Sequence, residues 1–172
     1  MPISRRDFLR FAVGGGLLAA SAYLFKEIFL PSQLSRNEGR VLEAVLDTLI
    51  PDDETPGALQ FGVAEKIKAK TAGDNRYRLL IKKGCAWLDT TAGELGSRSF
   101  ASLRGEDRDA VLAKALKGHA GSLQRIFFQQ IRADAFRYYY GDRRSWAQLG
   151  YNGPPQPNGF PDYYRAPAPQ SR

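Results

Sequence analysis

Few side chains in this sequence can carry chemistry, and the densest group of them is the acidic run Asp52-Asp53-Glu54. Three adjacent carboxylates suit a hard cation such as Ca²⁺ or Mg²⁺. The run also stands directly before Thr55-Pro56, a pair typical of the first turn of a helix, where the helix dipole favours negative charge. We interpret the run as part of a helix start and predict no metal site.

The single histidine and the single cysteine of the 172-residue chain exclude several kinds of site. One cysteine cannot form an internal disulfide or a Cys-rich metal centre, and one histidine cannot build a multi-histidine site. The C-x-x-C-H motif of covalently bound haem is absent. His119 stands at an expected helix junction, as a surface or capping residue, and Cys85 falls on an apolar stripe, as a small buried side chain. The sequence therefore predicts no catalytic residue and no cofactor bound by this chain.

Helical periodicity accounts for the body of the chain, residues 31–140. Ser35 and Glu38 have the spacing of a capping box, Thr55-Pro56 is expected to begin a second helix, and Asp74 to cap a third. No alternating strand pattern or Asn-Gly hairpin appears in this body. We predict an all-α fold, a small irregular bundle of four to six helices. Its buried stripes are expected at Val41, Leu42, Val45, Leu46 and Leu49, at Tyr77, Leu80, Ile81, Cys85 and Leu88, and at Leu123, Ile126, Phe127, Ile131, Ala135, Phe136 and Tyr139.

The first thirty residues have the features of an export signal. Residues 4–9, S-R-R-D-F-L, fit the twin-arginine pattern of bacterial proteins exported in the folded state, so the candidate signal residues are Arg5, Arg6, Phe8 and Leu9. The uncharged run over residues 11–25 is shorter than the ~20 residues that span a bilayer. We predict export to the periplasm, with cleavage after Ala22 or a retained signal, and a plain membrane anchor as the alternative.

Positive charge does not indicate nucleic-acid binding in this chain. The net charge is +7, and the signal segment carries part of it. The densest basic stretch lies within residues 66–83, where solvated helix faces explain most of the lysines. We therefore expect an acidic partner face or anionic lipid, and no nucleic acid, as the target of the basic surface.

Residues 141–172 differ in composition from the helical body. They hold four glycines and six prolines, and nine of the chain's twenty aromatic residues lie between Phe136 and Tyr164. Such a segment is unsuited to regular helix but too aromatic for a disordered tail. We predict an extended C-terminal strap that packs on the body, on a partner, or on both. Its candidate partner-binding residues are Arg143, Arg144, Trp146, Leu149, Tyr151, Pro154, Pro155, Phe160, Pro161 and Tyr163.

Three blocks of this sequence together resemble the gluconate 2-dehydrogenase subunit 3 family. They are the twin-arginine start, the block I-P-D-D-E-T-P-G-A at residues 50–58, and the block W-A-Q-L-G-Y-N-G-P-P-Q-P-N-G-F-P at residues 146–161. The resemblance implies a non-catalytic small subunit. A large partner subunit would carry FAD and oxidise the substrate, and a multihaem cytochrome c subunit would pass electrons to quinone. The small subunit would bring the folded flavoprotein through the twin-arginine translocase and stabilise it at the periplasmic face of the inner membrane.

Two other functions remain open from the sequence alone. An independent periplasmic enzyme would show turnover by the purified chain, and the scarcity of histidine and cysteine argues against it. A periplasmic adaptor or lipid-surface protein unrelated to dehydrogenases would reveal itself by the partners that it retains from solubilised membranes.

Overall fold

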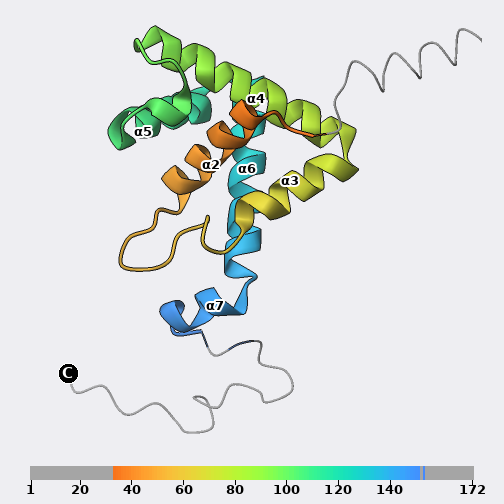
Figure 1. Ribbon diagram of the computed structural model, residues 1–172, viewed down its shortest axis with the longest axis vertical. Helices are drawn as coiled ribbons and strands as arrows, with labels where there is room; N and C mark the ends of the chain where they lie inside the picture. Colours follow the sequence, from red (N-terminus) through yellow and green to blue (C-terminus); the bar gives the residue numbers. More distant parts are fainter. Residues whose placement is uncertain (1–32, 152, 154–172) are drawn as a thin grey trace, which may run out of the picture.

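The computed structural model describes residues 33–151 and residue 153, which form a bundle of six α-helices with two 3-10 turns and no strand within that part of the chain. The all-α prediction is confirmed (Figure 1). None of the helices in the described part is both long and apolar enough to span a membrane. The elements are α2 (Arg36–Leu49), α3 (Val63–Gly73), α4 (Asn75–Glu94), η1 (Phe100–Ser102), α5 (Gly105–Lys117), α6 (Leu123–Tyr140), α7 (Arg143–Trp146) and η2 (Ala147–Leu149).

The two longest helices, α4 and α6, pack directly on each other, and α2, α3 and α5 contact both of them. Gly84 lies where α4 meets α6, because any Cβ at that position would overlap the ring of Phe127. The close approach buries Phe127 completely. In Figure 1, α6 runs from this crossing to the opposite end of the molecule, where α7 follows it.

The core is continuous across the helices, and the expected apolar stripes supply most of it. Five stripe residues were wrongly expected inside, because they lie at the edges of their helix faces: Leu49, Leu80 and Leu123 are half-buried, and Ile126 and Phe136 are exposed. The side chains of Leu42, Leu46, Ile81, Leu88 and Ile131 are fully buried. Lys70 of α3 closes one side of this core. Its Nζ lies 2.9 and 2.8 Å from the two carboxylate oxygens of Asp134, a buried residue of α6. An ion pair therefore joins α3 to α6 beside the apolar contacts.

Two helix starts follow the local sequence signals. At α2 the Ser35 hydroxyl accepts a hydrogen bond from the Glu38 N–H (3.2 Å), and the Glu38 carboxylate accepts one from the Ser35 N–H (2.6 Å). At α4 the Asp74 carboxylate accepts hydrogen bonds from the Arg76 and Tyr77 N–H groups. The predicted capping box and the predicted Asp74 cap are both confirmed.

The predicted helix start at Thr55-Pro56 is wrong. Residues 51–57 form a loop that folds back on the end of α2, since the Ala58 N–H donates to the Ile50 carbonyl (2.9 Å). A Cβ at Gly57 would lie 2.7 Å from the Pro51 carbonyl carbon, so the fold-back requires glycine. The second helix, α3, begins only at Val63, after Gly62 at φ 66°.

The strap predicted over residues 141–172 is not extended at its start. The Asp142 carboxylate caps α7 by accepting from the Arg144 N–H (3.1 Å), and the buried Ser145 hydroxyl donates to the Tyr139 carbonyl (2.9 Å). These local bonds fold residues 143–149 into α7 and η2 against the end of α6. The prolines lie further on, where they do not interrupt these turns.

Candidate functional site

Two sequence blocks that are distant along the chain meet at the α7 end of the bundle (Figure 1). The Tyr139 hydroxyl, near the end of α6, donates a 2.8 Å hydrogen bond to the Pro56 carbonyl in the 51–57 loop. The Arg144 guanidinium donates to the Phe61 carbonyl (3.4 Å) and lies 4.6 Å from the centre of the Phe61 ring. Residues 50–61 and 136–151 therefore form one surface, which we call the C-terminal surface.

Aromatic side chains dominate the C-terminal surface. The ring of Phe61 packs on Tyr139 with centroids 4.7 Å apart, and Tyr139 in turn contacts Tyr140 at 5.1 Å. Phe136 and Tyr140 meet edge to face at 5.7 Å, one helical turn apart. The Phe61–Tyr139 pair holds the end of α6 against the segment before α3, and the other two pairs lie within α6 itself.

Trp146 connects α7 to the end of α6 and to the residues that follow η2. Its indole N–H donates to the Tyr140 carbonyl (2.8 Å), and its ring meets Tyr151 edge to face at 5.1 Å. Gly153 packs over the same indole, where a Cβ would lie 3.3 Å from a ring carbon. Trp146 is only half-buried, so part of its ring is available to a partner.

A pocket of about 280 Å³ opens in the middle of the C-terminal surface, and we call it the C-terminal pocket. Its walls combine polar groups with large side chains that are open to solvent: Phe136 is 39% exposed, Tyr140 44% and Leu149 58%. Exposed apolar surface around a concavity is typical of a binding site. The lining residues are Leu49, Ile50, Pro51, Asp53, Thr55, Phe136, Tyr139, Tyr140 and Leu149.

The two arginines predicted to bind a partner have different roles. Arg144 forms a bidentate ion pair with Asp142. Its Nε lies 3.0 Å from one carboxylate oxygen, and a terminal nitrogen lies 2.9 Å from the other. Hydrogen bonds from Arg144 hold the pKa of Asp142 well below its usual range. Arg143 is exposed and lies 5.8 Å from the centre of the Trp146 ring. Arg144 thus stabilises the C-terminal surface, whereas Arg143 is an exposed charge beside the Trp146 ring.

The structure brings five of the predicted partner-binding residues to this surface and leaves the others outside the described residues. The five are Arg143, Arg144, Trp146, Leu149 and Tyr151. Those outside are Pro154, Pro155, Phe160, Pro161 and Tyr163, and the signal residues Arg5, Arg6, Phe8 and Leu9. Sequence reasoning missed the pocket walls at Phe136, Tyr140 and residues 49–55. Two signals pointed to the aromatic wall, namely the aromatic residues concentrated from Phe136 onward and the i, i+4 spacing of Phe136 and Tyr140.

The acidic run stabilises the loop rather than a helix start, contrary to our interpretation. The Asp52 carboxylate accepts from the Gln60 side chain (2.7 Å), and the Asp53 carboxylate from the Thr55 N–H (3.0 Å). Among the described residues no group of three His, Cys, Asp or Glu side chains is arranged to hold a metal ion. The run is therefore a structural part of the C-terminal surface.

Cys85 and His119 lie away from this surface. Burial raises the pKa of the Cys85 thiol to about 12, and its Sγ lies 3.7 Å from the Glu38 carbonyl. The prediction of a small buried cysteine is confirmed. His119 is exposed, with its Nδ1 3.0 Å from the Ala120 carbonyl oxygen. Neither side chain has the setting of a nucleophile or of a general base.

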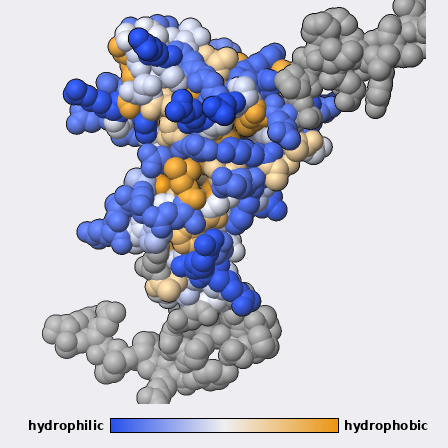
Figure 2. All heavy atoms as spheres, viewed as in Figure 1, coloured by the Kyte–Doolittle hydropathy of each residue, from blue (hydrophilic) through white to orange (hydrophobic). Residues whose placement is uncertain are grey.

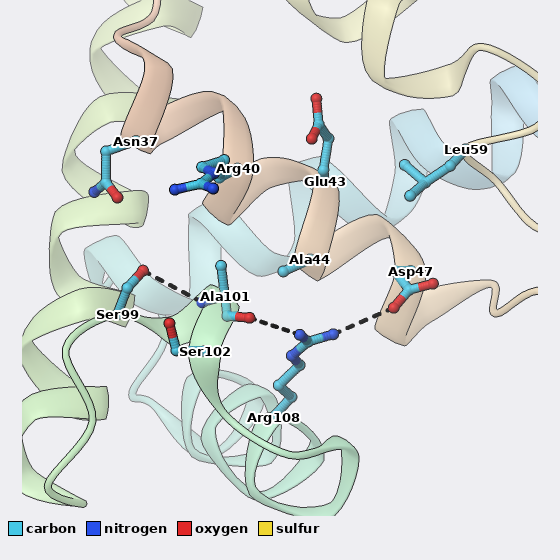
Figure 3. Close-up of a pocket in the computed structure, with 10 residues that line it drawn as sticks. All are labelled: Asn37, Arg40, Glu43, Ala44, Asp47, Leu59, Ser99, Ala101, Ser102 and Arg108. Carbon is cyan, nitrogen blue, oxygen red and sulfur yellow. Dashed lines mark hydrogen bonds and ion pairs between the residues drawn. The ribbon is translucent and has the colours of Figure 1, made fainter.

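A second, larger pocket of about 410 Å³ lies between α2, η1 and α5 (Figure 3). The Arg108 guanidinium crosses its floor, donating to the Ala101 carbonyl (2.7 Å) and to the Asp47 carboxylate (3.2 Å). The pocket is lined by both polar and apolar surface, and its central arginine is already engaged. Figure 2 shows hydrophilic side chains over most of the visible face, with apolar side chains gathered in smaller patches between them.

The fold and the C-terminal surface define a small all-α protein with an aromatic, partly exposed surface at one end of its bundle. The family model for gluconate 2-dehydrogenase subunit 3 matches residues 36–153, from the start of α2 to beyond η2. The chain belongs to this family, as its sequence blocks indicated. Comparison with curated proteins and with solved structures finds no match.

Proposed function

We propose that this chain is the non-catalytic small subunit of an FAD-dependent sugar or sugar-acid dehydrogenase complex. In this role it binds the folded flavoprotein subunit, stabilises it and brings it through the twin-arginine translocase to the periplasm. FAD belongs to the large subunit and c-type haem to a cytochrome subunit of the same complex. The family to which the chain belongs is named for a subunit of such a dehydrogenase.

The observation that supports this proposal best is the meeting of two sequence blocks at the C-terminal surface. The 50–58 block and the 146–161 block carry the family resemblance, and Leu149 of the second block lines the C-terminal pocket together with Ile50, Pro51, Asp53 and Thr55 of the first. The hydrogen bond from Tyr139, which precedes the second block, holds the first block in place. Leu149 and Tyr151 are not part of the buried core, since they are 58% and 45% exposed. A surface built from such residues fits a protein partner.

The side chains with potential redox or acid–base chemistry support an accessory role. Cys85 is buried with a raised pKa, and His119 is exposed beside a backbone carbonyl. The sequence has no glycine fingerprint for a dinucleotide, so we assign the flavin to the partner. This chain's contribution is then binding and export, and the reaction takes place on the large subunit.

Transport in the folded state explains why the export signal and the binding surface belong to one chain. A flavoprotein must bind FAD before it leaves the cytoplasm, because the cofactor stabilises its folded state. A partner without a signal of its own can then cross only when it is bound to a chain that has one. The twin-arginine pattern at Arg5 and Arg6 suits this route.

Deletion of this chain from its native cell tests the proposal. We expect the flavoprotein subunit to remain in the cytoplasm or to be degraded, as measured by cell fractionation and by dye-linked dehydrogenase activity of the periplasmic face. Normal export with full activity in the deletion strain would contradict the proposal.

A signal variant separates escort from stabilisation. Arg5→Lys together with Arg6→Lys keeps both charges but removes the arginine pair. We expect the complex to form and to accumulate in the cytoplasm, with the flavoprotein protected from degradation. Periplasmic activity equal to the wild type in this variant would show that export does not depend on the twin arginines.

A further inference from the structure

The larger pocket, between α2, η1 and α5, contains one charge that has no partner among the described residues. We call it the α2 pocket, and its volume is about 410 Å³. Of its four charged lining residues, Asp47 and Arg108 pair with each other (3.2 Å). Glu43 pairs with Lys68 (2.6 Å). The fourth, the exposed Arg40, forms no ion pair and no side-chain hydrogen bond within the part of the chain that the structure describes.

The free hydrogen-bond donors of the α2 pocket suit a carboxylate. Figure 3 shows the Arg40 guanidinium on the Asn37 side of the pocket, turned away from the Glu43 carboxylate. The exposed Ser102 hydroxyl also lines the pocket and has no partner among the described residues. A guanidinium binds a carboxylate through two parallel N–H···O bonds, and a hydroxyl can donate to a nearby acceptor.

Exposed arginines continue along the two segments that border the α2 pocket. Arg36 precedes Arg40 by one turn of α2, and Arg98 and Arg104 stand on either side of η1. None of these arginines forms an ion pair or a side-chain hydrogen bond with the described residues. The sequence has no acidic residue from 95 to 105. Positive charge therefore extends beyond the pocket itself.

The acidic residues near these arginines are engaged elsewhere. Glu38 pairs with Lys82 (3.5 Å), and the Asp89 carboxylate accepts three hydrogen bonds. Glu106 and Asp107 lie in the first turn of α5, where the helix dipole favours negative charge, and they form no ion pair with the arginines in the described structure. The charge of the arginines is thus left for a partner.

The α2 pocket adjoins the C-terminal surface. Leu59 belongs to residues 50–61 of that surface, and it also lines the α2 pocket with 40% of its area exposed. A partner that covers the C-terminal surface therefore reaches the α2 pocket by continuing past Leu59. Figure 2 shows hydrophilic side chains over α2 on the visible face of the molecule.

We propose that the α2 pocket binds an acidic segment of the flavoprotein subunit, with one Asp or Glu carboxylate on Arg40 and further carboxylates along the neighbouring arginines. This assignment rests on the proposed function and adds the chemistry of a partner segment. Arginine is enriched at protein interfaces, because its planar guanidinium binds carboxylates in a fixed geometry. Glu43 and Asp47 on the pocket wall repel a continuous sheet of negative charge, so a peptide with spaced carboxylates fits better than a membrane.

Arg40→Gln tests the pocket, because it removes the charge and keeps a polar side chain. Arg40 is exposed and unpaired in the described structure, so the melting temperature should equal that of the wild type. We expect the affinity of the full chain for the purified flavoprotein subunit to fall about tenfold in a binding titration. Arg76→Gln is the matched control and should bind normally, since Arg76 is an exposed arginine at the start of α4, outside the pocket lining.

Two results separate this assignment from the proposed function. If Arg40→Gln binds the flavoprotein as tightly as the wild type, the pocket assignment is wrong and the proposed function stands. If the wild-type chain does not bind the flavoprotein, both are wrong. Ser102→Trp places an indole in the pocket from an exposed position and should also weaken the complex. A normal complex for Ser102→Trp would overturn the placement of the segment inside the pocket.

The neighbouring arginines are tested together by a triple change to glutamine at Arg36, Arg98 and Arg104. Because these side chains are exposed, the complex should weaken by about fivefold at low salt and by less at high salt. The same salt dependence as in the wild type would overturn their part in the assignment.

Two other occupants of the pocket predict different results. If anionic lipid filled it, the subunit alone would bind phosphatidylglycerol vesicles, and Arg40→Gln would lose the vesicles but keep the flavoprotein. If Asp162 of this chain filled it, Asp162→Asn would free the pocket and strengthen the complex. Either result would overturn the assignment. It expects equal vesicle binding by Arg40→Gln and the wild type, and an unchanged complex for Asp162→Asn.

Discussion

The Tyr139 hydroxyl donates a 2.8 Å hydrogen bond to the Pro56 carbonyl across 83 residues of sequence. Tyr139 is buried, and its ring packs on Phe61, so this contact joins the early loop to the end of α6. Both walls of the C-terminal pocket depend on that junction, because the loop supplies one wall and α6 the other.

Tyr139→Phe should therefore loosen the loop without unfolding the bundle. The change removes one hydrogen bond and leaves the Pro56 carbonyl without this donor, at a cost of about 1 kcal/mol in the free energy of unfolding. Amide exchange should rise at Ala58, whose N–H bonds the Ile50 carbonyl within the same loop. Tyr138→Phe, on the neighbouring half-buried ring, is the control and should leave exchange in the loop unchanged.

Gly84→Ala should destabilise the contact between α4 and α6. A Cβ at Gly84 would overlap the Phe127 ring, so the helices must separate, which lowers the free energy of unfolding by roughly 1–3 kcal/mol. The control is Gly93→Ala in the same helix, where a Cβ would meet no atom within 4 Å. That change should raise stability by up to about 1 kcal/mol through helix propensity. Equal melting temperatures for the two variants would refute the close approach.

The Lys70–Asp134 pair predicts a pH dependence of stability. Burial raises the pKa of Asp134, but hydrogen bonds from Lys70 and Gln130 outweigh it and hold the pKa below its usual value. A carboxyl with a lowered pKa in the folded state stabilises the protein above its unfolded pKa of about 4, and this stabilisation is lost as the pH falls through the folded value.

Asp134→Asn should consequently cost about 2 kcal/mol near pH 7, because the ammonium of Lys70 loses its partner. The difference from the wild type should shrink below about pH 4, where the wild-type carboxyl becomes protonated. Urea unfolding of the wild type and the variant, near pH 7 and below about pH 4, measures this difference in the free energy of unfolding. Asp109→Asn, which removes an exposed carboxylate of α5, should show no such pH-dependent difference.

Trp146→Ala should weaken partner binding while the helical circular dichroism is retained. The indole is half-buried and stabilises α7 locally through its bond to the Tyr140 carbonyl. Loss of a tryptophan anchor at an interface lowers affinity by roughly thirtyfold or more. Leu116→Ala, at an exposed apolar position on α5, should bind normally. Collapse of the helical signal in Trp146→Ala would instead show that this residue holds the bundle together.

Local signals predicted the parts of the fold that depend on neighbouring residues. The Ser35–Glu38 capping box and the Asp74 cap need only three or four residues, and both form as the sequence indicated. Cys85 lies on a regular apolar stripe, so its burial followed from periodicity. Such features are independent of the rest of the chain.

Long-range contacts decided the parts that sequence reasoning missed. Thr55-Pro56 has the composition of a helix start, but the bond from Tyr139 and the fold-back at Gly57 hold it in a loop. The caps at Asp142 and Ser145 were overlooked because the proline-rich residues after them dominate the composition of the segment. The C-terminal pocket was not predictable, since its walls become neighbours only in the folded bundle.

The long sequence separation between the pocket walls also sets when the pocket can exist during synthesis. One wall is made early, at residues 49–55, and the other only after residue 136, when α6 and η2 have been translated. A nascent chain that has folded only as far as α5 lacks half of the pocket. A partner that bound there would recognise finished, folded copies of the subunit and would not recognise incomplete ones.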